Sequence, residues 1–198
     1  MILSDREIRS ALAREALKIS PIPPDESWSS TAIDLRLAKE LVKWKSPGQA
    51  GVEAVICPHS PHYDFNSVRQ QFSEPIEIGI EGYIFRPGTF LLGWTKEKIQ
   101  LPHQSRLAAR VEGKSSLARL GIGIHVTAPT IHAGFGYVSG TDSYPGSSLQ
   151  LEMWNAGPLD VKIEEGMPIC QLIFELVDGT PEKGYAGRFL RQGPAVEA

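Results

Sequence analysis

The 198-residue sequence predicts a single, mainly β domain, a sandwich or barrel with a few helices. Short runs that alternate apolar and polar residues recur along the chain, as expected for half-buried strands. Glycine and proline separate these runs, for example at Arg86-Pro87-Gly88 and Glu165-Gly166. Because 41% of the residues are hydrophobic, a chain of this length can bury one substantial core.

The first element is a helix near the N-terminus. Ser4 followed by Glu7 is a capping-box pattern, in which each side chain satisfies a free backbone N–H of the first turn. The helix ends before Pro21, because proline cannot continue it. Its apolar stripe consists of Ile8, Leu12 and Ala16.

Strands follow in most of the remaining chain. Residues 32–37 alternate cleanly between apolar and polar types, which gives the period of two of a strand. Residues 46–73 are polar and predict a long loop, and residues 179–198 predict a C-terminal tail that is mobile on its own. Further strands are predicted over 75–80, 83–85, 89–95, 107–111, 148–154, 159–163 and 168–176.

Charge and cysteine content narrow the classes of function. A net charge of −3 argues against a broad surface for polymeric nucleic acid, although a small basic pocket remains compatible with it. The two cysteines, Cys57 and Cys170, form no CxxC pair, so a reducing cytoplasm is the expected compartment. The sequence shows neither a signal-peptide pattern at its start nor an apolar run that could span a membrane.

A short helix is predicted over 115–121, opened by Ser115 or Ser116 and stopped by Gly121. With Lys114 and the glycine before it, this segment has the composition of an anion site. It does not have the spacing of a Walker loop. An ordinary capped surface helix explains the same residues.

Glu152 is the candidate general base. It lies in an alternating run that puts Gln150, Glu152 and Trp154 on one face of the strand. A carboxylate beside a tryptophan is partly desolvated, which suits proton transfer. On spacing alone, an edge-strand glutamate that faces water is an equal alternative.

Several blocks in order resemble the dCTP deaminase family, part of the trimeric dUTPase superfamily. The resemblance runs from residue 2 to 194 and is weakest between about 40 and 75. It implies a distorted jelly-roll or β-barrel of the dUTPase-like type. The blocks are Ser4-Asp5, Ile33-Asp34-Leu35-Arg36-Leu37, Lys114 to Gly121, His125-Val126-Thr127-Ala128, Leu151-Glu152 with Asn155, Gly166-Met167 with Gln171-Leu172, and Tyr185-Ala186-Gly187-Arg188-Phe189 with Gln192-Gly193-Pro194.

The resemblance implies that Glu152 takes a proton from water and later returns one to the pyrimidine. It implies that Arg119 orients this carboxylate and that Ser115 holds the water and the amino group at C4. The backbone of Ala128 reads the base edge, and His132 lies near the sugar. The resemblance implies that the triphosphate is bound by Lys114, Ser116, Arg188 and Gln192. It places Tyr185, Arg188 and Gln192 in a C-terminal tail that closes over the substrate.

The resemblance further implies hydrolysis of dCTP to dUTP and ammonia in a homotrimer with sites between subunits. Mg²⁺ is expected on the substrate phosphates. Zinc is not expected, because zinc deaminases carry H-x-E and P-C-x-x-C signatures, whereas this chain has His132-Ala133-Gly134 and no CxxC. A polar loop explains His59 and His62 better than a metal pair.

Two departures leave alternatives open. The resemblance implies an aspartate in related dUTPases and some deaminases where this chain has His132, which argues against cleavage of the triphosphate to dUMP. Residues 136–147 form an insert rich in glycine, serine and tyrosine before the strand of Glu152. A bifunctional, dUMP-forming deaminase therefore remains one alternative, and a nucleotide-binding module without catalysis remains another.

Overall fold

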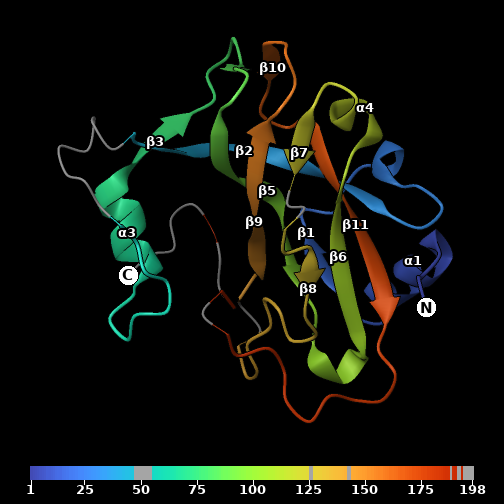
Figure 1. The fold of residues 1–198 in the computed structure, drawn as a ribbon. Helices are drawn as coiled ribbons and strands as arrows, with labels where there is room; N and C mark the ends of the chain where they lie inside the picture. The colour runs from blue at the N-terminus through green and yellow to red at the C-terminus, as the bar shows by residue number, and fades with distance from the viewer. Residues whose placement is uncertain (47–54, 125–126, 142–143, 188, 191–192, 194–198) are drawn as a thin grey trace.

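The computed structural model describes residues 1–46, 55–124, 127–141, 144–187, 189–190 and 193. The mainly β prediction is confirmed, and strands dominate the ribbon in Figure 1. The strands are β1 (Lys18–Ser20), β2 (Ile33–Trp44), β3 (Ser73–Glu77), β4 (Tyr83–Phe85), β5 (Phe90–Gln100), β6 (Leu107–Gly113), β7 (Ile122–Ile124), β8 (Thr130–Ile131), β9 (Ser147–Asn155), β10 (Val161–Ile163) and β11 (Pro168–Leu176).

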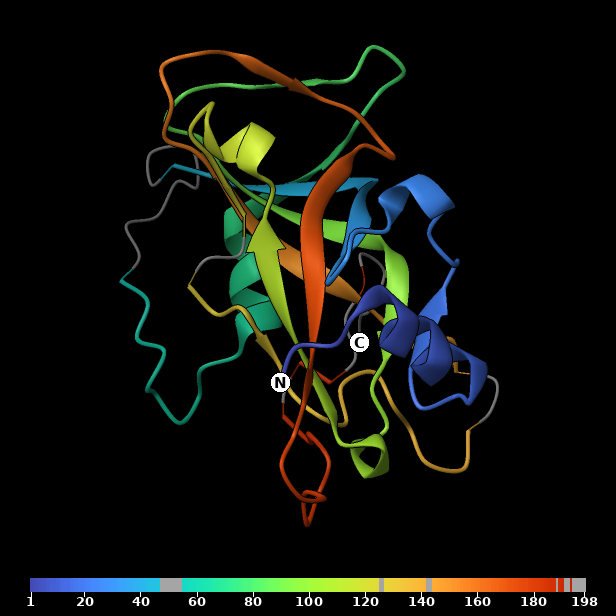
Figure 2. The same cartoon turned by 90° about the vertical axis from the view of Figure 1, so that its right-hand side faces the viewer.

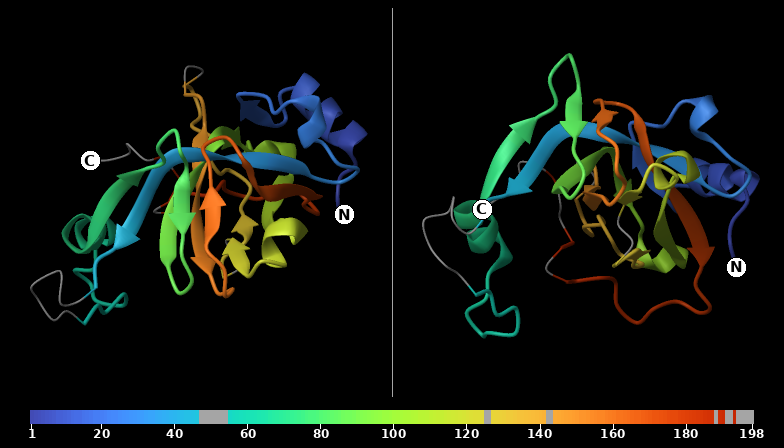
Figure 3. Two further views of the ribbon diagram at one scale, coloured as in Figure 1. Left: turned by 90° about the horizontal axis from the view of Figure 1, so that it is seen from above. Right: turned by 45° about the horizontal axis from the view of Figure 1, so that its top comes forward.

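One curved sheet forms the body of the molecule. Its strand order is β7-β9-β5-β2-β11-β6-β8, with β1 paired to β5 and β3 paired to β2. The long strands β2 and β5 run along the curve, as Figure 3 shows from above. The pairing of β2 with β5 shifts register between Leu37 and Leu41. The pairing of β5 with β9 shifts register between Trp94 and Lys98. Such bulges bend strands, and here they let the sheet close toward a half-barrel.

The core fills the inside of this half-barrel. The predicted alternation holds in β9, where Leu149, Leu151 and Met153 are fully buried and the residues between them are half-buried. The same alternation in β2 buries Ile33 and Leu35. Burial of these apolar side chains is the main stabilising term of the fold.

The N-terminal helix α1 spans Asp5–Ala13, and the Ser4 half of its predicted capping box is confirmed. The Ser4 hydroxyl accepts a hydrogen bond from the backbone N–H of Glu7 at 3.3 Å. The helix ends at Ala13, and Glu15 then adopts a φ of 56° before β1 begins. The predicted stripe is only partly inside the helix, since Ile8 is buried whereas Ala16 lies beyond its end.

A helix that the sequence analysis did not predict occupies part of the expected 46–73 loop. This helix, α3, spans Phe65–Phe72, and the Asp64 carboxylate caps it by accepting from the backbone N–H of Ser67 at 2.7 Å. Phe65 packs on a second apolar cluster on the outside of the sheet. The short strands β1, β7 and β8 were also not predicted, whereas the three-residue strands β4 and β10 lie within predicted segments.

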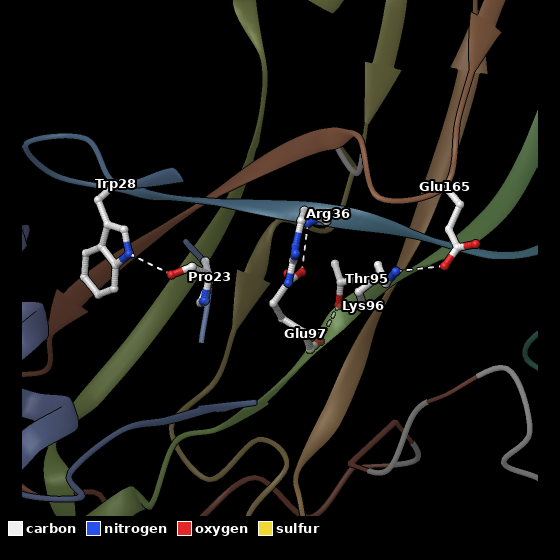
Figure 4. Close-up of polar contacts among 7 residues, drawn as sticks. All are labelled: Pro23, Trp28, Arg36, Thr95, Lys96, Glu97 and Glu165. Atoms are coloured by element: carbon white, nitrogen blue, oxygen red, sulfur yellow. Dashed lines mark hydrogen bonds and ion pairs between the residues drawn. The ribbon is translucent and has the colours of Figure 1, made fainter. Parts of the chain in front are cut away.

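An ion pair is buried between β2 and β5. The Glu97 carboxylate has no exposed surface and accepts hydrogen bonds from the backbone N–H of Arg36 at 2.8 Å and from Arg36 Nε at 2.7 Å. Figure 4 shows this pair beside Thr95, whose hydroxyl donates to the Glu97 carbonyl. The pair fixes the bulged part of β5 against β2, close to the start of β9.

No helix in the described part of the chain is both long and apolar enough to cross a bilayer.

Candidate functional site

A cavity of about 430 Å³ lies between the sheet, α3 and the C-terminal tail. Four of the ten predicted site residues line it: Ala128, His132, Glu152 and Tyr185. The volume is in the usual range for small-molecule sites. The other lining residues are Trp44, Phe65, Phe90, Leu92, Thr130, Ile131, Phe135, Leu149, Gln150 and Phe189.

The pairing of β9 with β5 positions Glu152 in this cavity. Glu152 lies opposite Leu92, and Gln150 lies opposite Trp94. Directly opposed residues of an antiparallel pair share a face, so the carboxylate has an apolar neighbour across the strand and an amide two residues along its own strand. Glu152 is half-buried, as the alternation in the sequence predicts.

His132 and Tyr185 close the cavity on the side of the tail. Their rings stack, with centroids 5.5 Å apart and planes inclined by 19°. The tail follows the body closely here, since the backbone N–H of Tyr185 donates to the Ala133 carbonyl at 2.8 Å. Gly134 permits this approach, because a Cβ on it would lie 2.3 Å from the Tyr185 nitrogen and its φ is 100°.

The other six predicted site residues are not among the described residues that line the cavity. Arg188 and Gln192 lie outside the described residues. The remaining four, Lys114, Ser115, Ser116 and Arg119, belong to the helix α4 (Ser115–Ala118) and its two ends. Figures 1 and 2 show α4 in the upper part of the molecule, whereas the chain after β11 runs along the bottom.

The predicted short helix is confirmed, and it begins at Ser115 but ends at Ala118, before Gly121. Lys114 is the residue at its N-cap, and no side-chain hydrogen bond caps the helix there. Ser115, Ser116 and Arg119 are exposed. Of the predicted catalytic set, Glu152 lines the cavity, whereas Ser115 and Arg119 do not.

Lys114 already has an anionic partner. Its ammonium group forms an ion pair with Asp34 of β2, and each side chain keeps about a fifth of its surface exposed (19%). Cys170 on β11 lies nearby, and its burial, with the charges of Glu97 and Asp34, raises the pKa of the thiol well above its usual value. This thiol stays protonated and has no part in the proposed chemistry.

The aromatic wall of the cavity was missed by sequence reasoning. Trp44, Phe65 and Phe189 come from three segments far apart in the sequence, and no local pattern links them. A signal for Gln150 was present, since alternation places it on the face of Glu152.

The cavity can support proton transfer at a planar ring. Aromatic faces suit stacking of a base, and a half-buried carboxylate can accept a proton from water. In the described ranges, no three His, Cys, Asp or Glu side chains come together as a potential metal site.

Comparison with known proteins identifies the relatives. Residues 2–177 match the family described as dCTP deaminase-like. A Methanosphaera stadtmanae protein named "dCTP deaminase, dUMP-forming" is 31% identical over 184 residues, which are 93% of this chain and 83% of the relative. A Dictyoglomus thermophilum protein of the same name is 36% identical over 188 residues, 93% of this chain and 85% of the relative. A Rhodospirillum rubrum protein named "dCTP deaminase" is 31% identical over 188 residues, 94% and 88% of the two chains.

A solved structure supports the fold. The crystal structure of a 2'-deoxycytidine 5'-triphosphate deaminase from Agrobacterium tumefaciens superposes with a TM-score of 0.63 at 20% identity. The match covers 88% of this chain and 48% of that one, so this chain spans about half the length of the Agrobacterium protein. At this identity the likeness concerns the fold alone.

Proposed function

Since this chain belongs to the dCTP deaminase-like family, we propose that it is a bifunctional enzyme that hydrolyses dCTP to dUMP, ammonia and pyrophosphate. The observation that carries the proposal is the cavity in which Glu152 lies among aromatic side chains. The names of the relatives favour dUMP as the product, because the Methanosphaera and Dictyoglomus proteins are both named dUMP-forming. The sequence alone gave dUTP as the first expectation.

In the deamination step, Glu152 takes a proton from a water molecule whose oxygen attacks C4 of the base. Glu152 passes this proton to N3 of the ring, where it stays. It then takes the proton of the new C4 hydroxyl and gives it to the amino group, which leaves as ammonia while C4 becomes a carbonyl. One carboxylate can serve as base and then as acid if it stays close to both atoms. The backbone of Ala128 holds the base edge in this proposal.

In the second step, water attacks the α-phosphorus and pyrophosphate leaves. Mg²⁺ bound through the triphosphate would neutralise its charge, as phosphate oxygens are preferred ligands of this ion. Lys114, Ser116, Arg188 and Gln192 are the proposed triphosphate contacts. For Lys114, this role requires its ammonium group to serve both Asp34 and a phosphate, for which its three donors suffice.

We also propose that a neighbouring copy of the chain completes each site. Ser115, Ser116 and Arg119 are exposed on α4 or at its end, and none of them lines the cavity in which Glu152 lies. A cyclic homotrimer would bring α4 of one chain to the cavity of the next through a head-to-tail interface. Arg119 would then orient Glu152 of the neighbour, and Ser115 would hold its water.

His132 supports the second candidate, a deaminase that stops at dUTP. An imidazole stacked on Tyr185 provides no fixed negative charge where related dUTPases and some deaminases carry aspartate. If the second water needs that carboxylate, the triphosphate leaves intact.

The product assay separates these candidates. The purified protein is incubated with dCTP and Mg²⁺, and ammonia, pyrophosphate and nucleotides are followed together, with Glu152→Gln as the matched inactive variant. Equal amounts of ammonia, pyrophosphate and dUMP support the bifunctional enzyme, whereas ammonia with dUTP alone supports the second candidate. Tight binding of dCTP without products would overturn both and favour a non-catalytic nucleotide-binding module.

A further inference from the structure

The last described residues of the tail contact an aromatic group on α3. The ring of Phe189 meets the ring of Phe65 edge to face, with centroids 5.9 Å apart and planes at 87°. Phe65 in turn packs on Trp44 at the end of β2, at 6.3 Å and 72°. Edge-to-face geometry is favourable for aromatic pairs, so this contact holds the tail against α3.

The next residue of the tail is held by a buried serine. The Ser147 hydroxyl, which has no exposed surface, donates to the Leu190 carbonyl at 2.9 Å. The Tyr144 hydroxyl lies 2.8 Å from the same Ser147 oxygen. Because a serine hydroxyl has one proton and that proton goes to Leu190, Tyr144 is the donor in the second bond. The chain of donors runs from Tyr144 through Ser147 to Leu190.

The segment that carries Tyr144 is fastened to the sheet. The Gln100 side-chain amide donates to the Tyr144 carbonyl. Gly136 and Gly146 both pack on the Ile99 carbonyl, where a Cβ would lie only 2.0 Å and 2.6 Å from the oxygen. Residues 136–141 and 144–147 therefore offer the tail a fixed anchor.

We propose that these two contacts form a tail latch, defined as Phe65 with Trp44 on one side and Tyr144 with Ser147 on the other. The latch holds the tail over the cavity of Glu152, so that Phe65 and Ser147 are positioning residues for a reaction in which they touch no reacting atom. Its relevance to turnover rests on the proposed function, because the cavity is there the substrate site.

The origin of the latch in the sequence supports this inference. Its two sides come from the 136–147 insert and from the 40–75 region, the two stretches that depart most from the resemblance to known deaminases. They are separate in sequence, yet they reach consecutive residues of the tail, Phe189 and Leu190. Each side supplies one contact of ordinary strength, and together they fix both the position and the direction of the tail.

Limited proteolysis tests the latch without any need for activity. Lys183 is exposed, but the next two residues lie against the body, since Gly184 packs on His103 and Tyr185 bonds to Ala133. Trypsin can cut after Lys183 only when the tail lifts. The rate at which the fragment beginning at Gly184 appears therefore measures the fraction of molecules whose tail is lifted.

The variants form two matched pairs. Phe65→Ala removes the ring that meets Phe189, and Phe72→Ala removes a phenylalanine from the other end of α3. Ser147→Ala removes the hydroxyl that holds Leu190, and Ser148→Ala removes the next hydroxyl of β9, on a residue that is also buried. We expect cleavage after Lys183 to be about fivefold faster in Phe65→Ala and Ser147→Ala. Phe72→Ala and Ser148→Ala should match the unmodified chain.

Kinetics with dCTP and Mg²⁺ then separate positioning from folding. Phe65 also lines the cavity, whereas Ser147 lines no part of it, so the kinetic readout is Ser147→Ala. A tail that closes less often lowers the competent fraction, so KM should rise several-fold in Ser147→Ala with a smaller change in kcat, whereas Ser148→Ala should leave KM unchanged. Unchanged cleavage in both latch variants would overturn the latch, as would equal acceleration in the controls. If dCTP is not a substrate, the cleavage rates still decide for or against the latch.

Discussion

Two variants that are inactive separately should recover activity when they are mixed in one assembly. Glu152→Ala removes the proposed base, and Ser115→Ala removes the hydroxyl proposed to hold the water. Loss of an acid–base group costs about 10²- to 10⁴-fold in rate, so each pure variant should be nearly silent. The structure separates the two residues, with Glu152 in the cavity and Ser115 exposed on α4.

The size of the recovery follows from this separation. Each site in a cyclic assembly takes Glu152 from one chain and Ser115 from the next. In a random one-to-one mixture, the first chain has an intact Glu152 half the time and the second has an intact Ser115 half the time. About a quarter of the sites are therefore intact, and the mixture should reach about a quarter of the unmodified rate.

The assay is steady-state release of ammonia from dCTP after the two chains have been co-refolded. The control mixes the unmodified chain with the double variant Glu152→Ala/Ser115→Ala. Without exchange of subunits this control gives about a half of the full rate, and complete exchange lowers it to about a quarter if sites are shared. The same control thus measures the exchange on which the first mixture depends.

One pattern would refute the reasoning. Suppose that mass analysis shows mixed assemblies, yet the mixture of the two single variants releases no ammonia and the control mixture keeps half of the full rate. Each site is then built within one chain. Ser115 would then have to act on Glu152 of its own chain.

Three further predictions follow from single contacts. Arg36→Met leaves the buried Glu97 charge without its partner and should lower the free energy of unfolding by about 3 kcal/mol, which lowers the melting temperature by roughly 10 °C. Lys162→Met, in an exposed ion pair, should change the melting temperature little. Equal shifts of the melting temperature in the two variants would contradict the prediction. Gly134→Ala should raise KM for dCTP by displacing the tail, and Gly140→Ala, also at positive φ but with open space, should not. Iodoacetamide at pH 8 should label exposed Cys57 and leave Cys170 unmodified until the protein is unfolded, as mass spectrometry would show.

The sequence predicted strands well where one face is buried throughout. The segments 107–111 and 168–176 became β6 and β11 with bounds that match within two residues. The prediction for β5 stopped at Thr95, whereas the strand continues to Gln100. The reason is Glu97, a charge that a sequence places at the surface but that Arg36 allows the fold to bury. The bulge beside it also breaks the period of two.

The helix α3 was missed although its signals were present. Asp64 is a good cap, and Phe65, Val68 and Phe72 follow at helical spacing. The polar residues and prolines around this short apolar stripe favoured the prediction of a loop over 46–73. Its apolar side is small because it covers only the outer cluster around Leu92 and Trp94, so the local pattern carries little information about its place in the fold.

Sequence periodicity predicts the part of the site that lies on a strand, but not the parts that enclose it. A regular strand fixes Glu152, and alternation along β9 was sufficient to predict its face and its neighbour Gln150. The aromatic wall and the tail come from segments with no period, and their meeting depends on contacts between residues more than a hundred positions apart, such as Phe65 with Phe189. A carboxylate that must meet a substrate atom needs a rigid support, whereas the parts that enclose the substrate must admit and release it. The division of this site between a sheet and a latched tail satisfies both requirements, and it explains why the sequence reveals the base more readily than the enclosure.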